Sequence, residues 1–128
     1  MKYLTIQQVL AIHDLAVRKY GGSHGIRDIG LVDSAVARPK STFGGEDLYP
    51  GLFEKAGALL QSLLKNHPFV DGNKRTALTS AAIFLKMNGY DLESVHKEEV
   101  EFALKVDNEH LEVEQIASWL KKHSKKRK

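Results

Sequence analysis

Two long apolar segments lie close together in the chain, at residues 51–66 and 73–88, and they limit the folds that the chain can adopt. In the second segment, apolar side chains would surround nearly the whole circumference of a helix. A helix of this kind is usually covered by other elements on all sides. We therefore expect a domain built around a buried central helix, with Gly89 as its C-terminal stop.

Helical spacing of apolar residues extends over much of the remaining chain. It predicts further helices over about residues 5–20, 31–38, 97–106 and 113–122. Thr5 is a suitable N-cap for the first of them, and Gly21 ends it. The second could be capped by Asp28 or could start near Gly30. No segment shows the strict alternation of a strand. The predicted fold class is all-α, a compact helical bundle that forms a single domain over residues 1–120.

Residues 41–50 interrupt the helical pattern. Gly44 and Gly45 place a bend there, which fits either a small hairpin or an irregular loop. A hairpin at this point could form a flap over a binding site. Composition alone supports an ordinary surface loop equally well.

The basic character of the chain is confined to its C-terminal tail, residues 121–128. The whole chain has a net charge of +3 from 19 basic and 16 acidic residues, and six of the basic residues lie in this tail. The remaining body therefore carries an excess of acid. Because no aromatic side chains are interleaved with the charges, the tail favours a solvated terminus over a nucleic-acid site.

Cysteine is absent, which excludes disulfides and thiolate metal sites. No apolar run approaches the ~18 residues of a transmembrane helix, and the N-terminus lacks the pattern of a signal peptide. We therefore expect a cytoplasmic protein that does not contact a membrane.

The segment HPFVDGNKR, residues 67–75, separates the two apolar segments and carries residue types suited to anion binding. The helix that starts near Asn73 presents unpaired N–H groups and a partial positive charge, which favour a phosphate. Gly72 lets the backbone approach a ligand closely. Lys74 and Arg75 place two cations in the first helical turn, where the helix dipole disfavours them, and such a local conflict is typical of a functional site.

Two residues of this segment each have more than one interpretation, and one histidine outside it is a further candidate. Asp71 could cap the following helix, or its carboxylate could hold a divalent cation such as Mg²⁺ against phosphate oxygens. His67 could be a satisfied side chain at a helix end, or a general base beside the anion site. His13 lies among apolar helix residues, which favours a structural role.

The same segment resembles the signature of the Fic/Doc superfamily, H-x-F-x-[DE]-G-N-G-R-x-x-R. The matching residues are His67, Phe69, Asp71, Gly72, Asn73 and Arg75. Lys74 replaces a Gly of the signature and Leu78 replaces its second Arg. The resulting run NKRTAL is similar to the Doc ("death on curing") branch, as are the sequences around residues 12–14, 25–30 and 84–89.

This resemblance implies a small helical bundle with the motif in a loop before a central helix. It implies His67 as the catalytic base, Asp71 as the residue that serves the metal, and ATP and Mg²⁺ as cofactors. It also implies that phosphates are held by Gly72, Asn73, Lys74 and Arg75. Most Fic proteins transfer AMP to a protein hydroxyl, whereas the Doc branch transfers the terminal phosphate of ATP to a threonine of elongation factor Tu.

Lys74 and Leu78 favour the second of these reactions. Lys74 occupies space in which a backbone could contact the phosphate chain, and Leu78 removes a clamp for the rest of that chain. We hypothesise a toxin of a type II toxin–antitoxin system that transfers the γ-phosphate. The alternatives are an AMP transferase that uses the same residues and a non-catalytic module that binds nucleotide or nucleic acid.

Many Fic proteins carry an inhibitory segment, [ST]-x-x-x-E-[GN]. The stretches that begin at Thr42 and Ser94 come near this pattern, but each lacks the final Gly or Asn, and we interpret both as coincidence. The resemblance implies instead an antitoxin partner, whose helix-forming segment folds into a groove of this protein.

Overall fold

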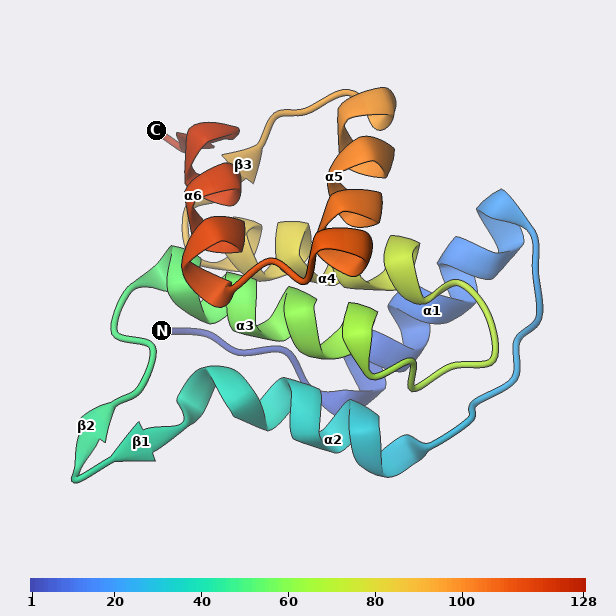
Figure 1. Cartoon of the computed structure of the whole chain (residues 1–128), viewed down its shortest axis with the longest axis horizontal. Helices are drawn as coiled ribbons and strands as arrows, with labels where there is room; N and C mark the ends of the chain where they lie inside the picture. Colours follow the sequence, from blue (N-terminus) through green and yellow to red (C-terminus); the bar gives the residue numbers. More distant parts are fainter.

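The computed structural model describes the whole chain, residues 1–128. It is mostly helical, as the sequence predicts (Figure 1). The α-helices are α1 (Ile6–Tyr20), α2 (Ile29–Ala37), α3 (Leu52–Lys65), α4 (Asn73–Met87), α5 (His96–Glu109) and α6 (Val113–Lys122). The short elements are the 3-10 helix η1 (Arg38–Lys40) and the strands β1 (Thr42–Phe43), β2 (Glu46–Asp47), β3 (Tyr90–Leu92) and β4 (Ser124–Lys126). None of the helices is long and apolar enough to cross a membrane.

Local capping explains where several helices begin. Thr5 and Gln8 form a reciprocal capping box at α1, in which each side chain bonds the other residue's backbone N–H. The carboxylate of Asp28 accepts a hydrogen bond from the N–H of Gly30 and caps α2. Of the two possible starts of this helix, the structure has the one capped by Asp28, so that α2 begins at Ile29.

The antiparallel pair α3 and α4 forms the centre of the molecule, with α1 and α2 on one side and α5 and α6 on the other (Figure 1). Ala77, Ala81 and Leu85 of α4 are fully buried, and Phe84 is almost so, which confirms the buried central helix. Gly57 of α3 lies so close to α6 that a Cβ atom would stand 3.0 Å from the carbonyl oxygen of Val113. The missing side chain therefore allows these two helices to pack closely.

A hairpin does form at Gly44 and Gly45, between β1 and β2. It is held at the first turns of α3, where the buried ammonium of Lys55 donates hydrogen bonds to Asp47 and to the carbonyl of Pro39. His67 follows the opposite end of α3, which has 14 residues and is therefore about 20 Å long. The hairpin thus stands away from His67 and does not cover it (Figure 1).

The chain's two ends are both attached to the turn after α4. The side chain of Asn88 exchanges hydrogen bonds of 2.9 and 2.8 Å with the backbone of Lys2. The carbonyl of Gly89 accepts from the N–H of Arg127, and β4 pairs antiparallel with β3. Residues 124–126 of the tail therefore form a strand along the open edge of β3, while Lys125 and Lys126 stay exposed to solvent. Strands of three residues are too short for alternation to reveal them.

Candidate phosphate and nucleophile site

The loop between α3 and α4 is closed by the side chain of Asn73. Its amide donates to the carbonyl of Phe69 over 2.9 Å, and its oxygen accepts from the N–H of Phe69 over 3.0 Å. Asn73 is buried and Phe69 packs into the core. The side chain of Asn73 therefore shapes the loop, so that only the backbone N–H of this residue is free to meet a ligand.

The segment from Gly25 to Asp28 runs beside this loop and braces it. The N–H groups of Arg27 and Asp28 both donate to the carbonyl of Pro68, and Val70 donates to the carbonyl of Gly25. Gly25 must be small, because a Cβ atom there would stand 2.7 Å from a methyl carbon of Val70. This segment belongs to the stretch in which the sequence resembles the Doc branch, and its contacts give that resemblance a structural reason.

Arg27 contacts the motif loop, although the sequence alone did not single it out as a site residue. Its Nε donates to the carbonyl of His67 and its second terminal nitrogen to the carbonyl of Asn66, each over 2.6 Å. His67 has a φ of +50°, which few residues other than glycine adopt. The two hydrogen bonds therefore hold the backbone of the predicted base in a conformation that it would otherwise rarely populate.

His13 is buried, and its role is structural, as predicted. Its ring stacks on that of Phe69 with 3.8 Å between the ring centroids. Its Nε2 lies 2.8 Å from the carbonyl oxygen of Asp71, and because a carbonyl can only accept, Nε2 donates. α1 thus fixes the end of the loop just before α4 begins.

The N-terminus of α4 presents three backbone N–H groups, those of Asn73, Lys74 and Arg75, to the outside of the helix. The first N–H that bonds within the helix is that of Thr76, which donates to the carbonyl of Gly72. No side chain caps α4 and no acidic residue lies in its first turn. Gly72 has a φ of +76°, which turns the chain into the helix without a side chain in front of these donors. The arrangement is an open anion site.

Asp71 does not cap α4, so the capping interpretation is wrong. Its carboxylate accepts from the N–H of Gly72 over 2.8 Å, and its side chain stays exposed. Gly22 makes room for it, since a Cβ atom there would stand 2.6 Å from the Oδ2 atom of Asp71. The chain gathers no set of three or more metal-ligating side chains. One free carboxylate beside a phosphate site nevertheless fits Mg²⁺, which takes most of its ligands from phosphate and water.

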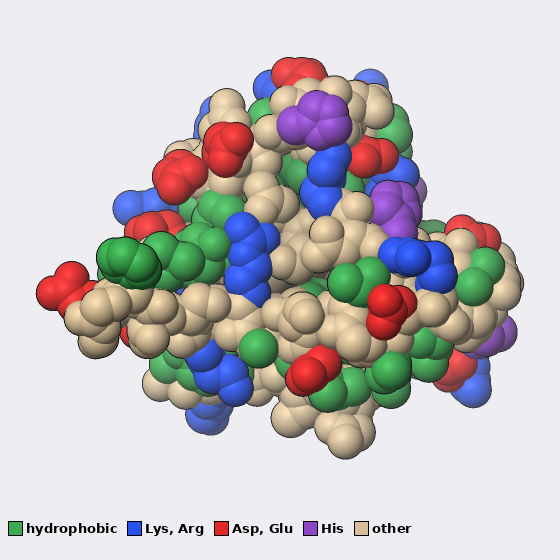
Figure 2. All heavy atoms as spheres, turned by 60° about the horizontal axis from the view of Figure 1, so that its bottom comes forward, with side chains coloured by type: hydrophobic (Ala, Val, Ile, Leu, Met, Phe, Trp, Pro, Cys, Tyr) green, Lys and Arg blue, Asp and Glu red, His purple; other side chains and the backbone are tan.

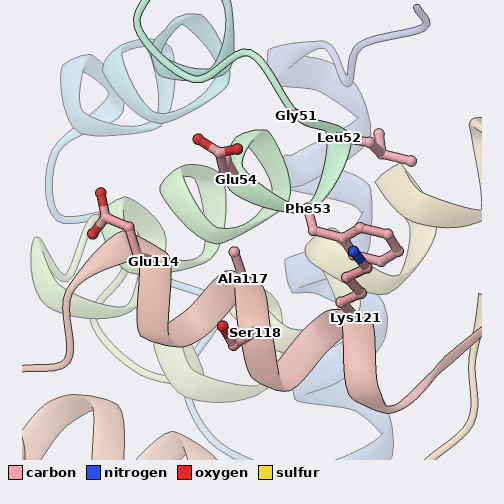
Figure 3. A pocket seen from close by; sticks show the side chains of 8 residues that line it. All are labelled: Gly51, Leu52, Phe53, Glu54, Glu114, Ala117, Ser118 and Lys121. Carbon is pink, nitrogen blue, oxygen red and sulfur yellow. The ribbon is translucent and has the colours of Figure 1, made fainter.

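All six predicted site residues line one cleft of about 410 Å³. Its other walls come from Tyr20, Gly21 and Val70. A second cleft, of about 320 Å³, lies between the start of α3 and α6 (Figure 3). Glu54 and Glu114 stand on the same side of that second cleft and Lys121 is its only cation, so it is poorly suited to polyphosphate.

The two cations of the motif both meet acids of α5. The Nζ atom of Lys74 lies 3.5 Å from the Oδ2 atom of Asp107, and the Nζ atom of Lys65 lies 3.6 Å from the Oδ1 atom of the same carboxylate. Burial alone would raise the pKa of Asp107, but the two lysines outweigh it and the pKa is lowered. Arg75 forms a 2.9 Å ion pair with Glu99.

Residues 94–99, which we interpreted as a coincidental near match to an inhibitory segment, therefore do reach the site. They reach it through Glu99, whereas the glutamate of the near match is Glu98. The sequence contains no signal for this contact, because 24 residues separate Arg75 from Glu99.

Comparison with known proteins agrees with this geometry. The model of the Fic/DOC family matches residues 3–85. A protein of Mycolicibacterium smegmatis named Toxin Doc is 52% identical over 91 residues, which cover 71% of this chain and 68% of the relative. A protein of Escherichia phage P1 named Protein kinase doc is 35% identical over 89 residues, or 70% of each chain. With the motif loop and the central helix arranged as described, the chain belongs to the Fic/DOC family.

Proposed function

We propose that this protein is a cytoplasmic toxin that transfers the γ-phosphate of ATP to a hydroxyl of a translation protein, with elongation factor Tu as the expected target. The observation that carries the proposal is the uncapped start of α4 in one cleft with the exposed residues His67 and Asp71. Two relatives named Toxin Doc and Protein kinase doc support the choice of reaction class.

The chain's own residues supply distinct parts of the reaction. The free N–H groups at the start of α4 and the guanidinium of Arg75 hold phosphate oxygens. His67 accepts the proton of the acceptor hydroxyl as its oxygen attacks the γ-phosphorus. A new P–O bond to the acceptor forms, the bond between the γ-phosphorus and the bridging oxygen breaks, and ADP leaves with that oxygen. Asp71 would hold Mg²⁺, which when bound would neutralise charge on the phosphates.

AMP transfer is the nearest alternative, and two side chains of α4 argue against it. Leu78 is almost fully buried in the core and does not line the cleft, so nothing at this position clamps an extended phosphate chain. Lys74 extends towards Asp107 on α5. We expect label from the γ-phosphate of ATP, and not from the α-phosphate, on the protein target. Transfer of α-label alone would replace the kinase proposal with AMP transfer.

A non-catalytic binding module is the alternative of a different class. It would need no general base, so His67→Ala would leave growth inhibition intact. On the face shown in Figure 2, basic and acidic side chains are interspersed, without the concentration of positive charge that a nucleic acid requires there. We expect the His67→Ala protein to be non-toxic when its expression is induced.

The proposed antitoxin has a suitable surface beside the phosphate cleft. A shallow apolar cleft between α1 and α4 is lined by Ile12, Leu15, Ala16, Lys19, Tyr20, Thr79 and Ile83. Leu15 is 63% exposed, and Tyr20 also lines the phosphate cleft. We propose that an amphipathic helix of the antitoxin packs here, with its apolar face on Leu15 and an acidic residue near Lys19.

Co-expression tests this surface. Leu15→Glu should abolish rescue of growth by the antitoxin gene product, because it places a charge in the apolar contact. Leu48→Glu is the matched control, since Leu48 is similarly exposed but lies beside the distant hairpin. Equal rescue of both variants would exclude the α1–α4 cleft as the contact.

A further inference from the structure

The guanidinium of Arg75 is held from several directions by residues outside the motif. One terminal nitrogen donates to Glu99 over 2.9 Å, and the other lies 3.0 Å from the Nδ1 atom of His96. The ring of Tyr20 lies against the guanidinium, with 4.7 Å between the guanidinium carbon and the ring centroid. Only 16% of the Arg75 side chain is exposed. A side chain in such surroundings has little freedom to change rotamer.

Glu99 is itself fixed in place. Its second carboxylate oxygen accepts a hydrogen bond of 2.9 Å from the hydroxyl of Ser94, and 20% of its side chain is exposed. Ser94 lies just before α5, so the carboxylate is tied both to its own helix and to the preceding turn. Glu99 is therefore a rigid acceptor and not a mobile surface charge.

The contacts on Arg75 leave donors for a ligand. A guanidinium has five N–H donors, and Glu99 and His96 occupy one each. The remaining donors include Nε–H, and Arg75 lines the phosphate cleft. Glu99 can thus fix the orientation of the Arg75 guanidinium and still leave its other N–H donors free for a ligand.

We propose that Glu99 is a positioning residue, which holds Arg75 in the rotamer that binds a nucleotide phosphate. This inference rests on the proposed function, because it assumes that Arg75 contacts the nucleotide. Folding already restricts the Arg75 side chain to one rotamer. Nucleotide binding therefore does not incur the loss of side-chain conformational entropy again. α5 lies outside residues 3–85, the part of the chain that the family model matches.

The direct test is the affinity of the full-length protein for a non-hydrolysable ATP analogue in the presence of Mg²⁺, measured by calorimetry. Glu99→Ala should weaken binding about three- to tenfold, the effect of freeing one long side chain. Glu99→Gln keeps an oxygen towards Arg75 and should stay within about twofold of the unaltered protein. Glu101→Ala is the matched control, because Glu101 is an exposed acid of the same helix without an ion pair.

A double-mutant cycle separates positioning from other effects. If Glu99 acts through Arg75, the double variant Arg75→Ala/Glu99→Ala should bind the analogue no more weakly than Arg75→Ala alone. Tighter binding by both Glu99 variants would show that the carboxylate competes with phosphate, which overturns the proposal. Unchanged binding by Glu99→Ala would overturn it as well. Failure of the unaltered protein to bind the analogue would instead refute the proposed function.

Discussion

The Nε atom of Arg27 donates a 2.6 Å hydrogen bond to the backbone carbonyl of His67, across 40 residues of sequence. Arg27 thus holds the backbone of His67, the base of the proposed reaction, and leaves the side chain of His67 free to act in the cleft. Arg27 makes a second bond to Asn66, so a planar, two-pronged donor suits this position better than an ammonium group does.

We therefore expect Arg27→Ala to reduce the turnover number by at least about tenfold, because a small displacement of a catalytic group has effects of this size. Arg27→Lys should recover only part of the loss, since one ammonium cannot match both carbonyls. The measurement is γ-phosphate transfer under saturating ATP. Arg18→Ala provides the control, because Arg18 is exposed and pairs only with Asp14 on its own helix. Full activity of Arg27→Ala would contradict a positioning role.

His67→Ala should lower the rate of phosphate transfer by about 10²- to 10⁴-fold, the usual contribution of a general base. Binding of the non-hydrolysable ATP analogue should change little, because the backbone donors of α4 remain. Parallel measurements of transfer and of binding check this separation. A His67→Ala protein that lost both equally would indicate a collapsed loop and not a missing base.

Gly22→Ala should impair both folding and activity. The added methyl group would stand 2.6 Å from the carboxylate of Asp71, and the φ of +113° at this position is strained for any residue with a side chain. Gly44→Ala is a matched control, because Gly44 also has a positive φ but has no atom within 4 Å of the new methyl group. We expect Gly22→Ala to cost more stability than Gly44→Ala by about 1 kcal/mol or more, and to raise the Mg²⁺ concentration needed for activity.

Asp71→Asn should raise the Mg²⁺ concentration required for half-maximal transfer, because the amide is a weaker ligand for a hard cation. Since Asp71 does not cap α4, thermal stability should be nearly unchanged. Titration of activity with Mg²⁺, together with a melting curve, checks both statements. An unaltered Mg²⁺ dependence would remove Asp71 from the metal site.

Asp107 should make stability depend on pH. Its pKa is lowered in the folded protein by Lys74 and Lys65, so its contribution is present above the unfolded value of 3.8 and is lost as the pH falls through the folded value. Asp107→Asn should therefore lower the free energy of unfolding by up to about 1 kcal/mol at pH 7, a size typical of partly exposed pairs. The difference from the unaltered protein should shrink towards pH 3. Denaturant titrations at the two pH values would show whether it does.

Features that depend on neighbouring residues in sequence were predictable. The capping box at Thr5, the central helix and the loop at residues 67–72 follow from spacing and residue type, because they are local. The convergence of His67 and Asp71 in one cleft also agrees with the sequence.

The missed features depend on contacts between distant segments. Arg27 reaches the loop across 40 residues, and Glu99 reaches Arg75 across 24. The interpretation of Asp71 as a cap was a reasonable local inference, but Gly72 is the N-cap of α4 and Asp71 lies outside it. Pairing of β4 with β3 likewise requires the folded core, which brings residue 126 beside residue 90.

The attachment of both chain ends to Asn88 and Gly89 makes the polypeptide nearly a closed ring. A flexible linker could therefore join the two ends of the chain. New termini could then be opened between Gly44 and Gly45, in an exposed turn that lies far from His67. In such a circular permutant, residues 67–75 of the phosphate cleft would precede Tyr20 and Gly21 in the sequence, and α6 would precede α1.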